Sequence, residues 1–300
     1  MSISSSDSPV SGRPHSACNR LLLWLRVIRP QTLFASVCPV LAGWHAATER
    51  PLSTALVTLC CALSLQILSN LINDWYDFER GTDQAGRAGF RRALAEGEIT
   101  PEQMRCAICI TLAITLLLGL WLVLKGGWII LGIGLTALLF AWLYTATRHS
   151  LSYLGIADIF VFLYYGVIAS AGTTYLLDGR FSRMSLLSGA ACGLISMCVL
   201  IINNLRDMAS DRAAGKRTFP VRFGKKAGEA GMLAVILLIP VCLWPAFGLC
   251  LPMLAVVPAL MLYRRVRKAA GAGYNPCLMA AGVINLCYTL LLLLTTTPAA

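Results

Sequence analysis

Long apolar segments constrain this sequence most, because they alternate with short polar stretches along all 300 residues. Hydrophobic residues make up 57% of the chain and charged residues 13%, and the mean hydropathy is +0.71. A soluble domain carries about 25% charged residues, and a transmembrane helix needs roughly 17–25 apolar ones. Because unpaired backbone groups are too costly in lipid, such segments must be helices. We therefore predict an all-α, multi-pass transmembrane bundle of about nine helices, over residues 32–48, 52–72, 104–124, 127–146, 154–177, 184–205, 230–248, 249–263 and 277–296.

The start of the chain differs from the rest. Residues 1–19 are polar and rich in Ser, and Arg20, Arg26 and Arg29 lie between them and the first long apolar segment. The apolar stretch Leu21–Leu25 is too short for the hydrophobic core of a signal peptide. We predict a disordered polar tail over residues 1–19 and a single transmembrane domain over residues 20–300, which begins with an interfacial helix.

Basic residues predict the orientation of the spans. If the N-terminus is cytoplasmic and all the predicted spans cross, most of the 25 Lys and Arg residues lie on the cytoplasmic side. Only Arg50, Lys125, Arg180 and Arg183 then lie outside. This distribution follows the positive-inside rule, which also accounts for the net charge of +11 without a nucleic-acid partner.

Two acidic clusters occur where apolar segments end. The first is the stretch NDWYDFERGTD at 73–83, and the second is NNLRDMASD at 203–211. Carboxylates at the edge of a membrane span are costly and mark functional sites. Both clusters fall on the predicted cytoplasmic side, after the second and the sixth spans. Pairing with neighbouring Arg residues at a loop surface would explain one cluster, but not the recurrence of the same amide and carboxylate pattern.

The spacing within the clusters predicts a shared cation site. Positions three and four apart lie on one face of a helix. Carboxylates crowded into one pocket repel each other, and a hard cation with oxygen ligands removes that repulsion. Mg²⁺ fits because it takes one or two carboxylates together with substrate phosphates. The residues aligned in this way are Asn70, Asn73 and Asp77, with Asp74 to one side, and Asn203, Asp207 and Asp211.

Four stretches carry a resemblance to a known family. They are Arg29-Pro30-Gln31-Thr32-Leu33, the first acidic cluster, the segment from Tyr144-Thr145 through Tyr153-Leu154-Gly155 to Asp158, and the second cluster continued to Gly215-Lys216-Arg217-Thr218. Together they resemble the UbiA superfamily of intramembrane prenyltransferases, and within it the branch that prenylates 1,4-dihydroxy-2-naphthoate in menaquinone synthesis. The resemblance extends over most of the chain. It implies a nine-helix membrane enzyme that joins a polyprenyl diphosphate to an aromatic acceptor with Mg²⁺.

The resemblance also implies roles for individual residues. The expected metal ligands are Asp74, Asp77, Asp83, Asp207 and Asp211. The residues expected to bind the diphosphate are Asn70, Asn73, Arg87, Asn203, Arg206, Lys216 and Arg217. The expected catalytic residues are Asp77, Asp207, Asp211 and Asp158. Whether Arg148 or His149 takes part stays open.

The implied reaction transfers a polyprenyl group to 1,4-dihydroxy-2-naphthoate with decarboxylation and gives demethylmenaquinone. We expect the protein in the inner membrane of a bacterium. The distribution of basic residues predicts that the N-terminus and the active site lie on the cytoplasmic side. Other acceptors, 4-hydroxybenzoate or homogentisate, stay open. Two other classes also stay open: a cation-coupled transporter would place its acids nearer the midplane, and a CDP-alcohol phosphotransferase packs its acids into one continuous motif.

Overall fold

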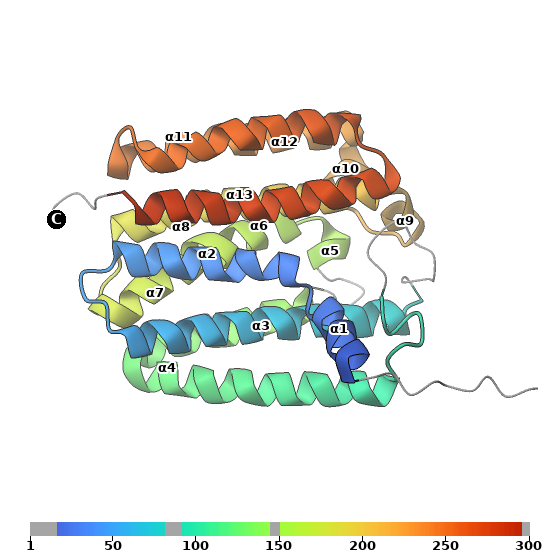
Figure 1. Cartoon of the computed structure of the whole chain (residues 1–300), viewed down its shortest axis with the longest axis horizontal. Helices are drawn as coiled ribbons and strands as arrows, with labels where there is room; N and C mark the ends of the chain where they lie inside the picture. Colours follow the sequence, from blue (N-terminus) through green and yellow to red (C-terminus); the bar gives the residue numbers. More distant parts are fainter. Residues whose placement is uncertain (1–16, 82–91, 145–150, 296–300) are drawn as a thin grey trace, which may run out of the picture.

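The computed structural model describes residues 17–81, 92–144 and 151–295, and its regular elements in those ranges are helices (Figure 1). The first half contains α1 (Ala17–Ile28), α2 (Pro30–Ala46), α3 (Leu52–Glu79), α4 (Pro101–Leu143), α5 (Leu151–Leu154), α6 (Ala157–Phe162), the π-helical turn η1 (Leu163–Val167) and α7 (Ile168–Asp178). The second half contains α8 (Arg183–Arg206), α9 (Met208–Ala213), α10 (Phe219–Phe223), α11 (Lys225–Phe247), the 3₁₀ turn η2 (Leu251–Ala255), α12 (Val256–Lys268), the 3₁₀ turn η3 (Gly271–Tyr274) and α13 (Asn275–Leu293).

The number of helices that can cross a membrane is lower than predicted. Within the described ranges, 6 helices are long and apolar enough, and the bent pair Asn19–Ile28 and Pro30–Ala46 makes 7 if it counts as one span. The prediction of about nine spans is therefore not confirmed. Part of the difference lies in the predicted span 249–263, which falls on η2 and α12, with 5 and 13 residues. Neither reaches the length of a membrane span.

The rest of the difference lies in α4, which covers the predicted spans 104–124 and 127–146. The helix begins at a capping box, in which Thr100 accepts a hydrogen bond from the backbone of Gln103, and continues for 43 residues. A straight helix of that length would measure about 65 Å, twice the thickness of a bilayer core. Gly127 breaks the helical geometry with φ 63° and ψ −151°. Residues from both sides of this break line one cavity, so the two halves of α4 face the same interior space.

The long helices lie side by side and bury a continuous core in the second half of the chain. The largest cluster of buried apolar side chains joins α8, α11, α12 and α13, with Ile202, Met232, Ile236 and Tyr288 fully enclosed. The first half is less completely filled. There α2, α3, α4 and α7 surround an apolar cavity of about 390 Å³.

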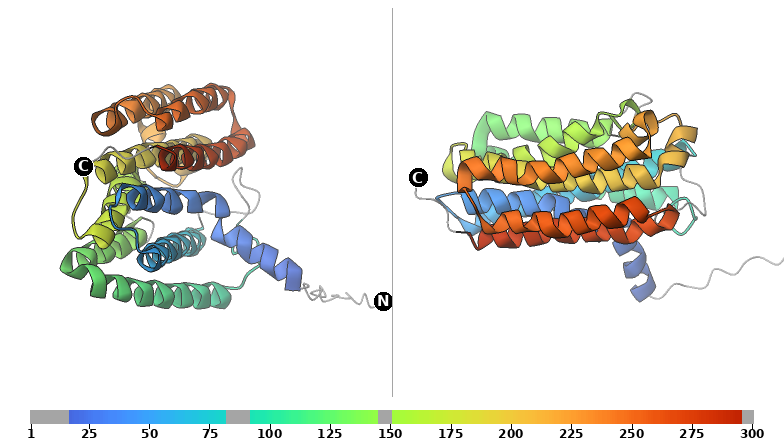
Figure 2. Two further views of the ribbon diagram at one scale, coloured as in Figure 1. Left: turned by 60° about the vertical axis from the view of Figure 1, so that its left-hand side comes forward. Right: turned by 90° about the horizontal axis from the view of Figure 1, so that it is seen from above.

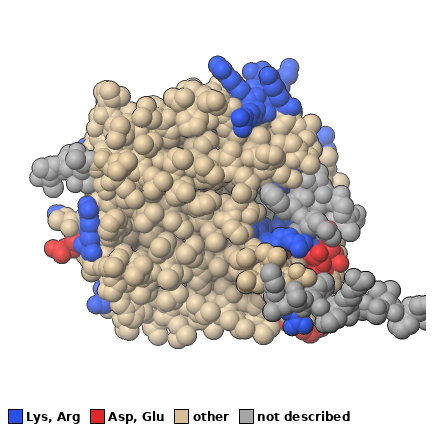
Figure 3. Space-filling view, in the orientation of Figure 1, with Lys and Arg blue, Asp and Glu red and all other residues tan. Residues whose placement is uncertain are grey.

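Charged side chains lie mainly towards the two ends of the helix bundle. On the face shown in Figure 3, Lys, Arg, Asp and Glu gather at the ends, and other residues cover the middle. Large apolar side chains face outward along α4, where Leu124 is 78% and Trp128 is 85% exposed. Because exposed apolar surface of this extent is stable in lipid, the chain is an integral membrane protein.

The helix α1 projects from the bundle, as the two views of Figure 2 show. It begins at Ala17, within the segment predicted as a tail. Leu21 and Leu22 are exposed on it, whereas Val27 is buried against α3 and the turn at 93–99. A helix that exposes some apolar side chains and buries others against the bundle suits the interface between membrane and water. The short helices α5, α9 and α10 lie at the same end of the bundle as α1 (Figure 1).

Candidate active site

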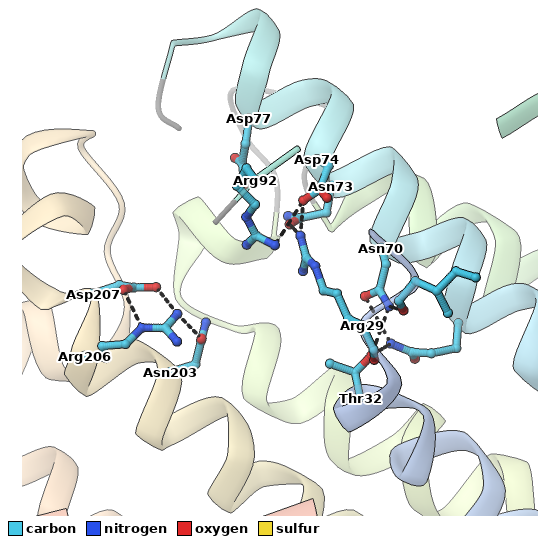
Figure 4. A network of polar contacts seen from close by, with 12 residues as sticks. Arg29, Thr32, Asn70, Asn73, Asp74, Asp77, Arg92, Asn203, Arg206 and Asp207 are labelled. Carbon is cyan, nitrogen blue, oxygen red and sulfur yellow. Dashed lines mark hydrogen bonds and ion pairs between the residues drawn. The ribbon is translucent and has the colours of Figure 1, made fainter. Parts of the chain in front are cut away.

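The first acidic cluster ends α3, and its Asp74 is held by two arginines. The Asp74 carboxylate is buried and forms ion pairs with Arg29 and with Arg92, whose Nη1 lies 3.1 Å from Asp74 Oδ1. Arg29 Nη2 also donates a hydrogen bond of 3.2 Å to Asn73 Oδ1 (Figure 4). Asp74, predicted as a metal ligand, therefore faces two guanidinium groups in this structure.

Arg29 reaches this position through an unusual backbone conformation. It separates α1 from α2 with φ 57°, the only positive φ outside glycine among the described residues. The turn that follows is held by Asn70, whose side-chain amide donates hydrogen bonds of 2.9 Å to the carbonyl of Ile28 and to Thr32 Oγ1. Asn70, predicted to bind diphosphate, thus ties α3 to the junction of α1 and α2. A strained residue at such a junction is typical of functional sites.

The second cluster ends α8, and its Asp207 is paired with the preceding residue. Arg206 donates to both carboxylate oxygens of Asp207, from Nε at 2.8 Å and from Nη2 at 2.7 Å. The same guanidinium donates to Asn203 Oδ1 at 2.6 Å and to Asn275 Oδ1 at 2.9 Å. Figure 4 shows this group facing the group around Asp74 across the site.

The spacing of the second cluster predicts one continuous helix, but the structure has a break within the cluster. The helix α8 ends at Arg206, and Asp207 has φ −93° and ψ 8°, in the bridge region that active-site residues often occupy. The four-residue steps persist across this junction, because Asp207 N donates to Asn203 O and Asp211 N donates to Asp207 O. The helix α9 begins after this break and contains Asp211.

Lys216 brings the two clusters together. Its Nζ lies 4.0 Å from Asp77 Oδ1 on α3 and 3.6 Å from Asp211 Oδ1 on α9. Both carboxylates are buried, at 5% and 8% exposure. The structure thus places one carboxylate from each cluster against the same ammonium group.

The residues around Lys216 fit a divalent cation by the chemistry of their donor atoms. Within the described ranges, no group of three or more His, Cys, Asp and Glu side chains converges as a preformed metal site. Asp77 and Asp211 provide two buried carboxylates from different helices, and both contact the ammonium group of Lys216. Mg²⁺ needs only one or two carboxylates when substrate phosphates complete its shell. The pair therefore suits a metal that arrives with a phosphorylated substrate.

The other predicted residues have different surroundings. The Arg217 side chain is exposed, but its backbone N–H donates a hydrogen bond of 3.0 Å to Tyr153 O. Asp158 lies at the start of α6, and its Oδ1 is buried without a hydrogen-bond partner in the part of the chain that the structure covers. Asp83, Arg87, Arg148 and His149 lie outside the described residues.

Tyr144 lies both on the wall of the apolar cavity and near the carboxylates of the polar site. The walls of the cavity come from α2, α3, both halves of α4, α6, η1 and α7, and Tyr144 lines the cavity at the end of α4. Burial raises the pKa of the Tyr144 phenol, and the nearby carboxylates of Asp77 and Asp211 add to the rise. Tyr144 is therefore a neutral group between the acidic clusters and the cavity.

The polar end of the cavity contains amide, hydroxyl and aromatic groups. Gln66 and Ser69 of α3 lie there, and the π-helical turn η1 contributes Tyr164 and Tyr165. Gly166 permits this turn to pack closely, because a Cβ at this position would lie 2.6 Å from the backbone of α8. Turns with π geometry inside helices are often found at functional sites.

Sequence reasoning missed three basic residues of the site. Arg29 and Arg92 were interpreted only through topology and resemblance, yet both contact Asp74. Arg80 lies within the first acidic cluster and has no role predicted from the sequence, yet its guanidinium lies over the rings of Tyr76 and Tyr153. The signal for Arg29 is its place in the stretch Arg29-Pro30-Gln31-Thr32-Leu33, which carries part of the family resemblance.

The fold and the site define a class of protein: a helical membrane protein in which buried carboxylates and basic residues from two helix ends converge beside an apolar cavity. The chain belongs to the UbiA prenyltransferase family, which its residues 34–295 match. It is 37% identical over 219 residues to the 1,4-dihydroxy-2-naphthoate octaprenyltransferase of Escherichia coli (strain K12), covering 69% of this chain and 70% of that protein.

One further relative and one solved structure are also similar to this chain. The protein of the same name from Mycobacterium leprae (strain TN) is 33% identical over 274 residues, covering 87% of this chain and 91% of that protein. Among solved structures, the fold is similar to that of a UbiA homologue from Archaeoglobus fulgidus bound to DMAPP and Mg²⁺. The TM-score is 0.63 at 17% identity, covering 90% of this chain and 97% of that one.

Proposed function

We propose that this protein transfers a polyprenyl group from an allylic polyprenyl diphosphate to 1,4-dihydroxy-2-naphthoate, with loss of the carboxylate, and so makes demethylmenaquinone. The observation that carries the proposal is the contact of Asp77 and Asp211 with one Lys216 beside an apolar cavity. This arrangement suits a substrate with an anionic head and a long apolar tail. The acceptor follows from the names of the bacterial relatives.

In this proposal Asp77 and Asp211 hold Mg²⁺, with Asp83, Asp207 and Asp74 as further predicted ligands. Bound Mg²⁺ would neutralise the charge that builds on the departing diphosphate. Lys216 and Arg206 are cations fixed in advance by hydrogen bonds and ion pairs, so they stabilise the same charge without rearranging. Arg87, Arg217, Asn73 and Asn203 stay predicted contacts of the diphosphate.

The aromatic acceptor would react at the polar end of the cavity. Phe140 and Tyr164 form an aromatic pair there, with ring centroids 5.0 Å apart. Gln66 and Ser69 add neutral hydrogen-bonding groups on the facing wall. Such a surface suits a flat, electron-rich ring with hydroxyl groups, which attacks the allylic carbon as the diphosphate leaves. Asp158, with a buried carboxylate oxygen, is the candidate to hold the proton of the acceptor.

The prenyl chain would occupy the apolar part of the cavity, between α3 and the two halves of α4. The site and the N-terminus would lie on the cytoplasmic side of a bacterial inner membrane, which places most basic residues inside. Exposed apolar residues of α4 border the cavity. A long polyprenyl tail would therefore extend between helices into the bilayer.

The test is a turnover assay with purified protein in detergent. Protein, Mg²⁺ and a polyprenyl diphosphate are incubated with 1,4-dihydroxy-2-naphthoate, 4-hydroxybenzoate or homogentisate in separate reactions, with a chelator as control. We expect a decarboxylated prenyl naphthol by mass spectrometry, from the naphthoate only and only with Mg²⁺. Product from another acceptor would transfer the assignment to that acceptor. Folded protein that makes no product with several chain lengths would overturn the proposal.

A further inference from the structure

Arg80 stands at the end of α3, three residues after Asp77. It caps the helix with αR geometry, so the side chains of Asp77 and Arg80 lie on the same face one turn apart. The Arg80 guanidinium carbon lies 5.7 Å from the centre of the Tyr76 ring and 5.5 Å from the centre of the Tyr153 ring. Two aromatic rings from separate segments therefore hold this guanidinium.

One donor of Arg80 has no hydrogen-bond partner among the described residues. Its Nη1 is buried and makes no hydrogen bond with any of the residues that the structure describes. Arg29 and Arg92 each also have a buried Nε without a hydrogen-bond partner among the described residues, but both pair with the Asp74 carboxylate. Arg206 likewise donates to the Asp207 carboxylate. A buried charged donor without an acceptor is costly, and such groups call for an explanation by a ligand or an ion.

Tyr153 connects Arg80 to the centre of the site. Lys216 Nζ lies 5.7 Å from the centre of the same ring, so Tyr153 contacts two cations. The Tyr153 carbonyl also accepts a hydrogen bond from Arg217 N, which fixes the segment that carries Lys216. Arg80 and Lys216 are thus held by one side chain, beside the carboxylates of Asp77 and Asp211.

We propose that Arg80 binds the diphosphate of the prenyl donor directly, and that Tyr153 is a positioning residue that keeps its guanidinium in place. The inference rests on the function proposed above. A guanidinium held by its faces against aromatic rings keeps its in-plane N–H groups for a ligand, and its fork matches phosphate oxygens. The Nη1 donor of Arg80 is the group that the phosphate would satisfy.

The test uses variants with matched controls. Arg80→Met keeps an apolar stem between the two rings and removes the donors, and Arg80→Lys keeps the charge without the fork. Arg105→Met is the control, because Arg105 also lies over an aromatic ring, 5.6 Å from the centre of Trp75, but is exposed and paired with Glu102. Tyr153→Leu tests the positioning role. Thermal unfolding without ligand selects the variants that fold like the wild type.

Two readouts separate this inference from the proposed function. The first is binding of magnesium pyrophosphate by calorimetry, which needs no turnover. We expect Arg80→Met to weaken it about 10- to 100-fold, Arg80→Lys to recover part of it, and Arg105→Met to change it less than about twofold. The second is steady-state kinetics, in which Arg80→Met and Tyr153→Leu raise the KM for the donor and leave the KM for the acceptor unchanged.

Each result decides one of the two statements. If the wild type makes product and folded Arg80→Met binds pyrophosphate and donor as the wild type does, the role of Arg80 is wrong and the proposed function stands. If the wild type binds pyrophosphate through Arg80 but prenylates no acceptor, the diphosphate site stands and the proposed reaction is wrong. If the wild type binds no magnesium pyrophosphate, the role of Arg80 is also overturned.

Discussion

Asp77 and Lys216 lie in ion-pair contact, with 4.0 Å between Oδ1 and Nζ, although they belong to opposite halves of the chain. The contact joins the end of α3 to the segment after α9, and Asp211 lies against the same ammonium. This single relationship makes one site out of two separate acidic clusters. It also shows which carboxylates are placed to share a cation.

Removal of either shared carboxylate should abolish turnover. We expect Asp77→Ala and Asp211→Ala each to lower Mg²⁺-dependent prenyl transfer by at least about 100-fold, because each removes charge that is preorganised around the leaving group. Asp178→Asn is the control, since Asp178 accepts hydrogen bonds from the backbone of Thr48 and Glu49 at the other end of the bundle. Wild-type rates in either alanine variant would contradict this role.

Lys216→Met should make the protein depend on Mg²⁺ for stability. The substitution removes the ammonium group between two buried carboxylates, and like charges in a buried pocket repel each other. We expect a loss of about 1–3 kcal/mol in unfolding free energy without metal, and partial recovery on addition of Mg²⁺. Thermal unfolding of wild type and variant with and without Mg²⁺ measures both effects. An equal response of the two proteins to Mg²⁺ would count against a cation site between Asp77 and Asp211.

Asp74→Asn should destabilise the protein strongly. It leaves Arg29 and Arg92 facing a neutral amide in a buried position, and breaking a buried ion pair costs about 3–5 kcal/mol. Arg26→Met is the control, because the ion pair of Arg26 with Glu98 is exposed and worth about 0–1 kcal/mol. Denaturant unfolding in detergent compares the two. Similar losses of unfolding free energy in both variants would mean that the buried ion pairs of Asp74 stabilise the protein no more than the exposed one does.

Filling the cavity should shorten the accepted prenyl chain. Gly119 and Gly134 both line the cavity, and a Cβ at either position would meet no atom within 4 Å. Gly119→Leu and Gly134→Leu should therefore lower turnover of long-chain donors about 10-fold or more relative to dimethylallyl diphosphate, because the added side chain occupies the space for the tail. Gly132→Leu is the matched control, since Gly132 has equal free space but does not line the cavity. A uniform effect on all chain lengths would place the tail elsewhere.

Several features of the site could be predicted from the sequence. The apolar segments predict membrane helices, and the edges of those segments place Asp74, Asp77 and Asp207 at helix ends on one side. The helical repeat correctly puts Asn70, Asn73 and Asp77 along one face of α3. The same repeat did not predict the break at Asp207, because the backbone leaves helical geometry at that residue without a glycine or proline to signal it.

The number of spans shows a similar limit. The boundary between the predicted segments 104–124 and 127–146 falls near Gly127, where a positive φ breaks the geometry of α4, although α4 counts as a single span. The segment 249–263 was predicted as one span, but a 3₁₀ turn precedes a helix of 13 residues there. Apolar composition measures solubility in lipid, and it does not distinguish a full span from shorter helices packed together.

The sequence by itself determined the class of the protein: a helical membrane bundle of the UbiA prenyltransferase family, with two acidic clusters at the cytoplasmic ends predicted for its helices. These properties depend on local composition and on the helical repeat. Only the tertiary structure decided which charges meet. It paired Asp74 with Arg29 and Arg92, placed Asp77 and Asp211 against Lys216, and left Arg80 between two tyrosine rings. Such contacts depend on how distant helices pack, and no spacing along the chain encodes the partner of a charge on another helix.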